Sequence, residues 1–309
     1  MSIYYNAFGP YIRNKFKDNV YKVNIDAGFT CPNRDGSIGF GGCIYCNNDS
    51  FRPSSVSPSL TVTKQIENGI AYLTKRYGAK KFIAYFQPYT NTYSSVDNLN
   101  RLYSEALSHP AVIGLAIGTR PDAVDAQKIE LLQSFTKDYF ILVEYGLQSI
   151  YDKTLDSINR GHNYKCFLDA LELTRNREIY IGTHIIVGFP TEDIKETLGM
   201  ADVISTLPIE FLKIHQLQVI KETKLADMYA DSPFELFSYY EYLDLLVRFI
   251  ERLDPNIVLQ RLFATAPDNI LIAPKWDRQR QQMIMDIDAH FKKYSSFQGK
   301  HYDPNIKNV

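Results

Sequence analysis

The sequence predicts an α/β protein whose parallel strands curl into a complete or partial barrel. Six short apolar runs alternate with amphipathic stretches along the chain, the pattern of repeated strand–helix units. Polar residues stand at or near the carboxyl ends of most of these runs. With 309 residues, 45% of them hydrophobic, the chain is long enough to bury a large core.

The predicted strands are short apolar runs. They cover Tyr21–Asp26, Phe82–Gln87, Val112–Gly118, Phe140–Gly146, Ile179–Gly188 and Phe211–Val219. Because strands that alternate with helices are joined by right-handed crossovers, we expect all six to pair in parallel.

A helix is expected after each strand. The helices cover Thr63–Tyr77, Val96–Leu107, a segment from about Ala126, Tyr164–Arg175, Asp193–Thr206 and Tyr239–Leu253. The first helix places Ile66, Ile70 and Leu73 on one face, as helical periodicity requires. Asp125 is a suitable N-cap for the third helix, and the fifth must end before Pro208.

Polar residues at the strand ends favour a barrel over a doubly wound sheet. Functional side chains gather at the carboxyl rim of (β/α) barrels. Any one of them could instead cap a turn, but the pattern recurs on five strands. These residues are Gln87, Thr119, Arg120, Glu144, Gln148, His184, His215 and Gln216.

Three segments make up the predicted domain organisation. An N-terminal arm covers residues 1–20, the barrel covers 21–253, and a C-terminal extension packed on the barrel covers 254–309. The extension contains a predicted helix, Asp277–Tyr294.

The net charge of −1 excludes a uniformly basic nucleic-acid binder but allows a local basic patch. From Lys275 to Lys307 there are seven Lys or Arg residues against four Asp, and the N-terminal arm is modestly basic and rich in Tyr. Such groups could hold a single-stranded nucleotide by phosphate contact and stacking, or they could form a solvated helix face. No apolar run has the length of a membrane span and the N-terminus does not resemble a signal peptide, so we expect a cytoplasmic protein with reduced thiols.

Three cysteines carry the main chemical signal. Cys31, Cys43 and Cys46 are spaced C-x11-C-x2-C, and Gly36, Gly39, Gly41 and Gly42 lie between the first two. Three thiolates suit a 4Fe-4S cluster with one open iron. A structural zinc site usually has four ligands, and a redox dithiol would leave Cys31 unexplained, but both stay open as alternatives. Cys166, on the apolar stripe of a predicted helix, is expected to be a buried structural thiol.

Nine segments, two of which contain the triad, form a recognisable series along the chain. They are YKVNIDAGFTCPNRDG, GGCIYC, AYFQPYTNTY, IGTRPD, VEYGLQS, INRGH, IIVGFPTE, KIHQLQV and LIAPKW, from about residue 21 to 276. In this order they resemble the radical S-adenosylmethionine (SAM) superfamily, and within it the YhcC/YtqA-type branch related to the elongator catalytic subunit. The resemblance implies a partial (β/α)6 TIM-like barrel.

The resemblance also implies the cofactor chemistry. Cys31, Cys43 and Cys46 would hold the 4Fe-4S cluster, and the amino and carboxylate groups of SAM would bind the open iron. One electron would cleave SAM to methionine and a 5′-deoxyadenosyl radical, which would abstract a hydrogen atom from the substrate. A flavodoxin- or ferredoxin-like one-electron reductant is the implied partner.

Further site residues follow from the same resemblance. Tyr45 would border the adenine, Gln148 and Arg160 would hold the SAM carboxylate and nearby groups, and His184 would bind the ribose. Glu144 would bind the SAM ammonium or ribose, or pair with Arg120. Gly188 and Pro190 would shape the adenine wall, and Arg120 and His215 would act on the substrate side.

Three departures from the family pattern concern the ammonium and substrate contacts. The usual Gly-Gly-Glu is replaced by YFQPYTNTY, which makes Gln87 and Thr90 candidates for the ammonium. Lys221-Glu222-Thr223 and Phe263-Ala264 stand where relatives read Lys-Gly-Thr and Thr-Gly.

The leading hypothesis is therefore a radical SAM enzyme that modifies a tRNA wobble-uridine side chain, with no DNA or membrane partner expected. The alternatives are a radical SAM enzyme acting on a metabolite or protein side chain, and a non-catalytic iron–sulfur or zinc protein.

Overall fold

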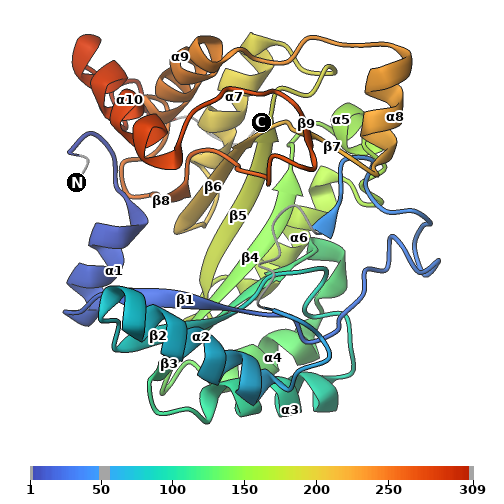
Figure 1. The fold of residues 1–309 in the computed structure, drawn as a ribbon, viewed down its shortest axis with the longest axis vertical. Coiled ribbons are helices and arrows are strands. Elements are labelled where there is room, and N and C mark those ends of the chain that lie inside the picture. The colour runs from blue at the N-terminus through green and yellow to red at the C-terminus, as the bar shows by residue number, and fades with distance from the viewer. Residues whose placement is uncertain (1–2, 49–55, 306–309) are drawn as a thin grey trace.

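A curled, fully parallel sheet forms the centre of the protein. The structure, a computed structural model, describes residues 3–48 and 56–305. Its main sheet has seven strands in the order β1-β2-β3-β4-β5-β6-β8, all paired in parallel. Figure 1 shows the curl of the sheet, with most helices on its outer face. The predicted partial barrel is confirmed.

The predicted strands are all present. They are β1 (Val20–Ile25), β2 (Lys81–Phe86), β3 (Val112–Thr119), β4 (Phe140–Gln148), β5 (Tyr180–Val187) and β6 (Phe211–Gln216). The sixth strand was expected to continue to Val219, but it stops at Gln216. The chain then turns into β7 (Val219–Ile220), which pairs antiparallel with β9 (Leu271–Ala273).

The expected helices follow their strands. They are α2 (Val62–Tyr77), α3 (Val96–Leu107), α4 (Ala126–Ser134), α6 (Tyr164–Thr174), α7 (Ile194–Ile204), α9 (Tyr239–Ile250) and α10 (Arg280–Lys293). The Asp125 carboxylate accepts a hydrogen bond from the Lys128 amide, as expected of an N-cap.

Several elements were not predicted. The strand β8 (Val258–Arg261) extends the main sheet beyond β6, and α1 (Phe8–Phe16), α5 (Asp152–Ser157) and α8 (Lys224–Asp231) are additional helices. Short helices and a four-residue strand carry too little periodicity to stand out in a sequence. Within residues 3–48 and 56–305, no helix has the length and apolar character needed to cross a membrane.

Helix α1 closes one end of the barrel. Its Ile12 and Phe8 pack with Phe211 and Val258 from the inner face of the sheet, together with Phe140 near the amino end of β4. Because this apolar plug fills the amino end, space for a ligand remains at the carboxyl end of the strands.

Candidate functional site

The cysteine loop is anchored to the segment that follows β4. The Asn33 side-chain amide donates to the Asn159 carbonyl at 2.6 Å, and the Asn159 amide donates to the Gly42 carbonyl at 2.8 Å. The Ile44 amide donates to the Ile158 carbonyl at 3.0 Å. A Cβ on Gly39 would lie 2.5 Å from Asn33 Oδ1, so the loop requires glycine there.

Cys31, Cys43 and Cys46 all line one cavity at the carboxyl rim of the sheet. Cys43 is buried, and Arg160 Nη1 lies 3.5 Å from its Sγ. Burial alone would raise the pKa of the Cys43 thiol, but the guanidinium of Arg160 outweighs it and lowers the pKa. The thiolate, which is the form that binds metal, is therefore favoured.

The three thiols are available to hold a cluster at this cavity. Among the residues that the structure describes, no three His, Cys, Asp or Glu side chains converge to hold one metal ion. A 4Fe-4S cluster needs no such convergence, because each cysteine binds a different iron. Within residues 3–48 and 56–305, three buried polar atoms on this cavity have no partner and could meet the polar groups of a bound cofactor: Thr90 Oγ1, Arg120 Nη1 and Arg160 Nε.

Arg160 and Gln148 line the cavity next to the cysteines. Arg160 Nη2 donates to the Gly146 carbonyl at 2.5 Å, and Gln148 has a positive φ of 75° after an irregularity in β4. A Cβ on Gly146 would lie 2.7 Å from Gln148 Nε2 and 2.9 Å from Arg160 Nη2. The glycine in VEYGLQS thus makes room for both side chains.

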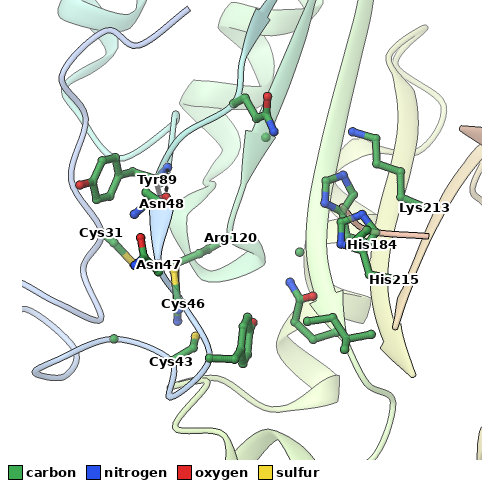
Figure 2. A pocket seen from close by; sticks show the side chains of 18 of the residues that line it. Cys31, Cys43, Cys46, Asn47, Asn48, Tyr89, Arg120, His184, Lys213 and His215 are labelled. Atoms are coloured by element: carbon green, nitrogen blue, oxygen red, sulfur yellow. Dashed lines mark hydrogen bonds between the residues drawn. The ribbon is translucent and has the colours of Figure 1, made fainter. Parts of the chain in front are cut away.

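The opposite wall carries an ion network around Glu144. Lys22 Nζ lies 2.8 Å from Glu144 Oε1, Lys213 Nζ lies 2.5 Å from Oε2, and His184 Nε2 lies 3.2 Å from Oε2. Although burial would raise the pKa of Glu144, the two lysines hold it well below its usual value. Burial, with help from Lys213, lowers the pKa of His184 to about 4. Figure 2 shows His184, Lys213 and His215 across the cavity from the three cysteines.

An apolar strip also lines the cavity. It consists of Tyr45, Ile186, Leu217 and Ile220, and the Tyr45 ring lies 6.1 Å from that of Phe189. Such a strip can hold the flat, apolar face of a base.

Most of the predicted site residues line this cavity. They are Cys31, Cys43, Tyr45, Cys46, Gln87, Arg120, Glu144, Gln148, Arg160, His184 and His215. Gly188 and Pro190 are not among the described residues that line it; a Cβ on Gly188 would instead lie 2.9 Å from the Phe237 ring. The individual roles of these residues stay predictions.

Two expectations change. Arg120 pairs with Asp122, at 2.6 Å, and not with Glu144, whose oxygens are occupied by Lys22, Lys213 and His184. Arg120 also lies beside the cysteines in Figure 2, away from His215. Cys166 is half-buried and not fully buried. Lys307 of the basic C-terminal segment lies outside the described residues.

Sequence reasoning missed Lys213 and Arg261, which also line the cavity. Lys213 stands two residues before His215 in β6, so the alternation of a strand could have placed both on one face. Arg261 belongs to β8, which was not predicted, and so no pattern pointed to it.

The comparisons with known proteins agree with this geometry. The family model described as the Radical SAM superfamily matches residues 31–204, and that of the Radical_SAM C-terminal domain matches residues 209–293. The Escherichia coli protein YhcC is 32% identical over 94% of this chain and 93% of its own length. A tRNA uridine(34) acetyltransferase of Methanocaldococcus infernus is 27% identical over 46% of this chain and 27% of that enzyme. The solved structure of Methanocaldococcus infernus Elp3 aligns with a TM-score of 0.69 at 17% identity, covering 90% of this chain and 64% of that one.

Proposed function

This chain belongs to the radical SAM superfamily, and from that membership we propose that it modifies the C5 side chain of a tRNA wobble uridine. The protein is a radical SAM enzyme whose cofactors are a 4Fe-4S cluster and SAM. Cys31, Cys43 and Cys46 would hold the cluster, which would supply the electron for reductive cleavage of SAM and hence for hydrogen abstraction from the substrate.

The proposed cofactor contacts follow from the cavity. Cys31, Cys43 and Cys46 hold the cluster, and Arg160 offsets the negative charge beside Cys43. Gln148 and Arg160 are placed next to them to receive the SAM carboxylate, since a guanidinium can bind a carboxylate through two hydrogen bonds. Tyr45 and Ile186 supply apolar surface for the adenine.

One observation carries the proposal: a single cavity joins the cysteine loop to the polar ends of β4, β5 and β6. A substrate bound there is in direct reach of both sets of residues. The tRNA identity is supported by similarity to the tRNA uridine(34) acetyltransferase, over 46% of this chain. Basic and aromatic residues near α10 also support it, with the Arg278 guanidinium 5.4 Å from the Tyr239 ring centroid and Lys293 Nζ 5.0 Å from that of Tyr294.

The proposed partners follow from the reaction. SAM cleavage consumes one electron, so a flavodoxin- or ferredoxin-like donor is required. A tRNA substrate would place the reaction in the cytoplasm.

The test of the cofactor assignment compares two cysteine variants. After anaerobic reconstitution, Cys43→Ala should lose the brown chromophore and release no 5′-deoxyadenosine from SAM. Cys166→Ala, a matched change at a half-buried thiol on α6, should retain both. Equal loss in the two variants would contradict the ligand assignment.

The test of the substrate is mass spectrometry of tRNA nucleosides from a strain that lacks the gene. We expect one C5-substituted uridine to disappear and its precursor to accumulate, and the Cys166→Ala gene to restore the profile while Cys43→Ala does not. An unchanged nucleoside profile would refute the tRNA proposal and leave the radical SAM activity standing.

A further inference from the structure

The wall opposite the cysteines contains a row of basic side chains from three neighbouring strands. In the register of the sheet, His184 on β5 stands opposite Lys213 on β6, and Lys213 stands opposite Arg261 on β8. His215 follows on the same face of β6, and all four side chains line the cavity. We call His184, Lys213, His215 and Arg261 the cationic wall.

Positive charge exceeds negative charge at the cationic wall. Lys22 Nζ and Lys213 Nζ both contact Glu144, the one carboxylate of this group, and Arg261 adds a further positive charge near both lysines. Both Glu144 oxygens are already engaged by Lys22, Lys213 and His184. Lys22 and Lys213 each direct a second N–H donor to Gln260 Oε1 and the Tyr85 hydroxyl, respectively, at 2.8 Å, which leaves one donor on each ammonium.

Arg261 is left without an acidic partner among the described residues. Its one hydrogen-bond neighbour is His215, with Arg261 Nη1 and His215 Nε2 3.5 Å apart. Burial and the Arg261 charge hold the pKa of His215 well below its usual value, so this imidazole is neutral and brings no counter-charge. A guanidinium has five N–H donors, so most of those on Arg261 remain available at the cavity.

Burial lowers the pKa of Lys213 well below its usual value, so the positive charge of this wall rests mainly on Arg261. A partly desolvated cleft with excess positive charge attracts an anion, and a guanidinium binds carboxylate or phosphate oxygens through two hydrogen bonds. We propose that Arg261, Lys213 and His215 bind an anionic group of the substrate, a carboxylate or a phosphate, at the wall opposite the cysteines. This inference rests on the proposed function, because the cysteine side of the cavity is assigned there to the cluster and SAM. A substrate anchored in this way would hold its reacting carbon between the two walls.

The test measures anion binding by the cluster-loaded full chain under anaerobic conditions at constant ionic strength. The probes are acetate, inorganic phosphate and, as a neutral isostere of acetate, acetamide; the readout is the rise in melting temperature with concentration, from which a dissociation constant follows. At least one anion should stabilise the protein saturably and acetamide should not. Tighter binding of acetate would indicate a carboxylate site, and tighter binding of phosphate would indicate a phosphate site.

Three variants locate the binding. Arg261→Gln should weaken anion binding about tenfold or more, since a charge-assisted pair is lost. Arg261→Lys should retain part of the affinity, because the positive charge remains while the planar guanidinium with its paired N–H donors is lost. Arg248→Gln, on the exposed side of α9 where Arg248 pairs with Asp244, is the matched control and should bind like the wild type. Equal binding of acetate and acetamide, or no effect of Arg261→Gln, would overturn the proposal.

The affinity for SAM provides the second readout. Arg261→Gln should bind SAM within about twofold of the wild type, because the SAM carboxylate is assigned to the cysteine side. If Arg261→Gln weakens the binding of both SAM and the anions, the cationic wall binds the cofactor, and the proposal is wrong. Anion binding at Arg261 with an unchanged tRNA nucleoside profile would retain this inference and reject the tRNA substrate. If the deletion strain lost the uridine modification but the protein showed no anion site, the tRNA substrate would be retained and this inference rejected.

Discussion

At the scale of single residues, Glu144 determines the charge balance of the cavity. It lies on β4 with a side chain that is not exposed, and two lysines and a histidine converge on it. A buried carboxylate is stable only with such partners, since removing one member of a buried pair leaves the other charge without compensation. The glutamate in VEYGLQS therefore has a structural role whether or not it touches SAM.

The low pKa of His184 predicts a pH-dependent stability. Its pKa in the folded protein is about 4, below the model-peptide value of 6.5, so the unfolded chain binds a proton between these two pH values and the folded chain does not. The His184 contribution is present above pH 6.5 and is lost as the pH falls toward 4, at a cost on the order of 3 kcal/mol. Glu144, whose pKa is also depressed, adds a loss below about pH 4.3.

Urea unfolding at pH 7 and pH 5 checks this expectation. The wild type should lose more stability between the two values than His184→Gln does. His109→Gln, a change at the half-exposed turn before β3, is the control and should follow the wild type. An equal loss in wild type and His184→Gln would show that His184 titrates normally.

At the scale of elements, Gly146 near the carboxyl end of β4 leaves space for two side chains on the proposed cofactor side of the cavity. A Cβ there would meet the ends of the Gln148 and Arg160 side chains. Gly146→Ala should displace these side chains and weaken SAM binding about tenfold, a loss of the size of one charge-assisted hydrogen bond, while the fold persists. Equilibrium binding of SAM to the reconstituted enzyme measures this.

Gly199→Ala on α7 is the matched control, because its added Cβ would meet only the Tyr151 hydroxyl, at 3.6 Å. It should bind SAM like the wild type. Unchanged SAM affinity in Gly146→Ala would remove Gln148 and Arg160 from the proposed contacts.

Helix α1 makes a second prediction at this scale. Ile12 is 2% exposed in the plug at the amino end of the barrel, whereas Ile194 at the start of α7 is 40% exposed. Ile12→Ala should lower the free energy of unfolding by about 2–4 kcal/mol, because it leaves a cavity in the core. Ile194→Ala should change it by about 0.5 kcal/mol or less. Denaturant titration compares the two, and equal effects would mean that α1 does not close the barrel.

At the scale of the whole molecule, the C-terminal segment is integrated with the barrel. Strand β8 pairs with β6, and Gln298 Nε2 donates to the carbonyls of Asp254 and Ile257 at 2.8 Å. The Gln298 Oε1 accepts from the Asn6 amide at 2.9 Å, which ties both ends of the chain together. Figure 1 shows α10 beside α9 and near the N-terminal segment.

Deletion of residues 254–309 should therefore prevent cooperative folding. The truncated chain would expose the edge of β6 and the apolar face of α9, and exposed edges of this kind aggregate. Size-exclusion chromatography and thermal unfolding measure the outcome. A monomeric truncated chain with a sharp transition would show that the barrel folds without the extension.

The repeating strand–helix order, the curled parallel sheet and the cysteine triad could all be predicted from the amino-acid sequence. They follow from local signals: apolar periodicity, an Asp cap, and cysteine spacing within one loop. The pairing of Arg120 with Asp122, the contact of Lys22 with Glu144 and the position of Arg261 beside Lys213 emerge from the folded chain alone. These contacts join residues far apart in the chain or choose between nearby partners, and strand register and burial specify them in ways that no local pattern records.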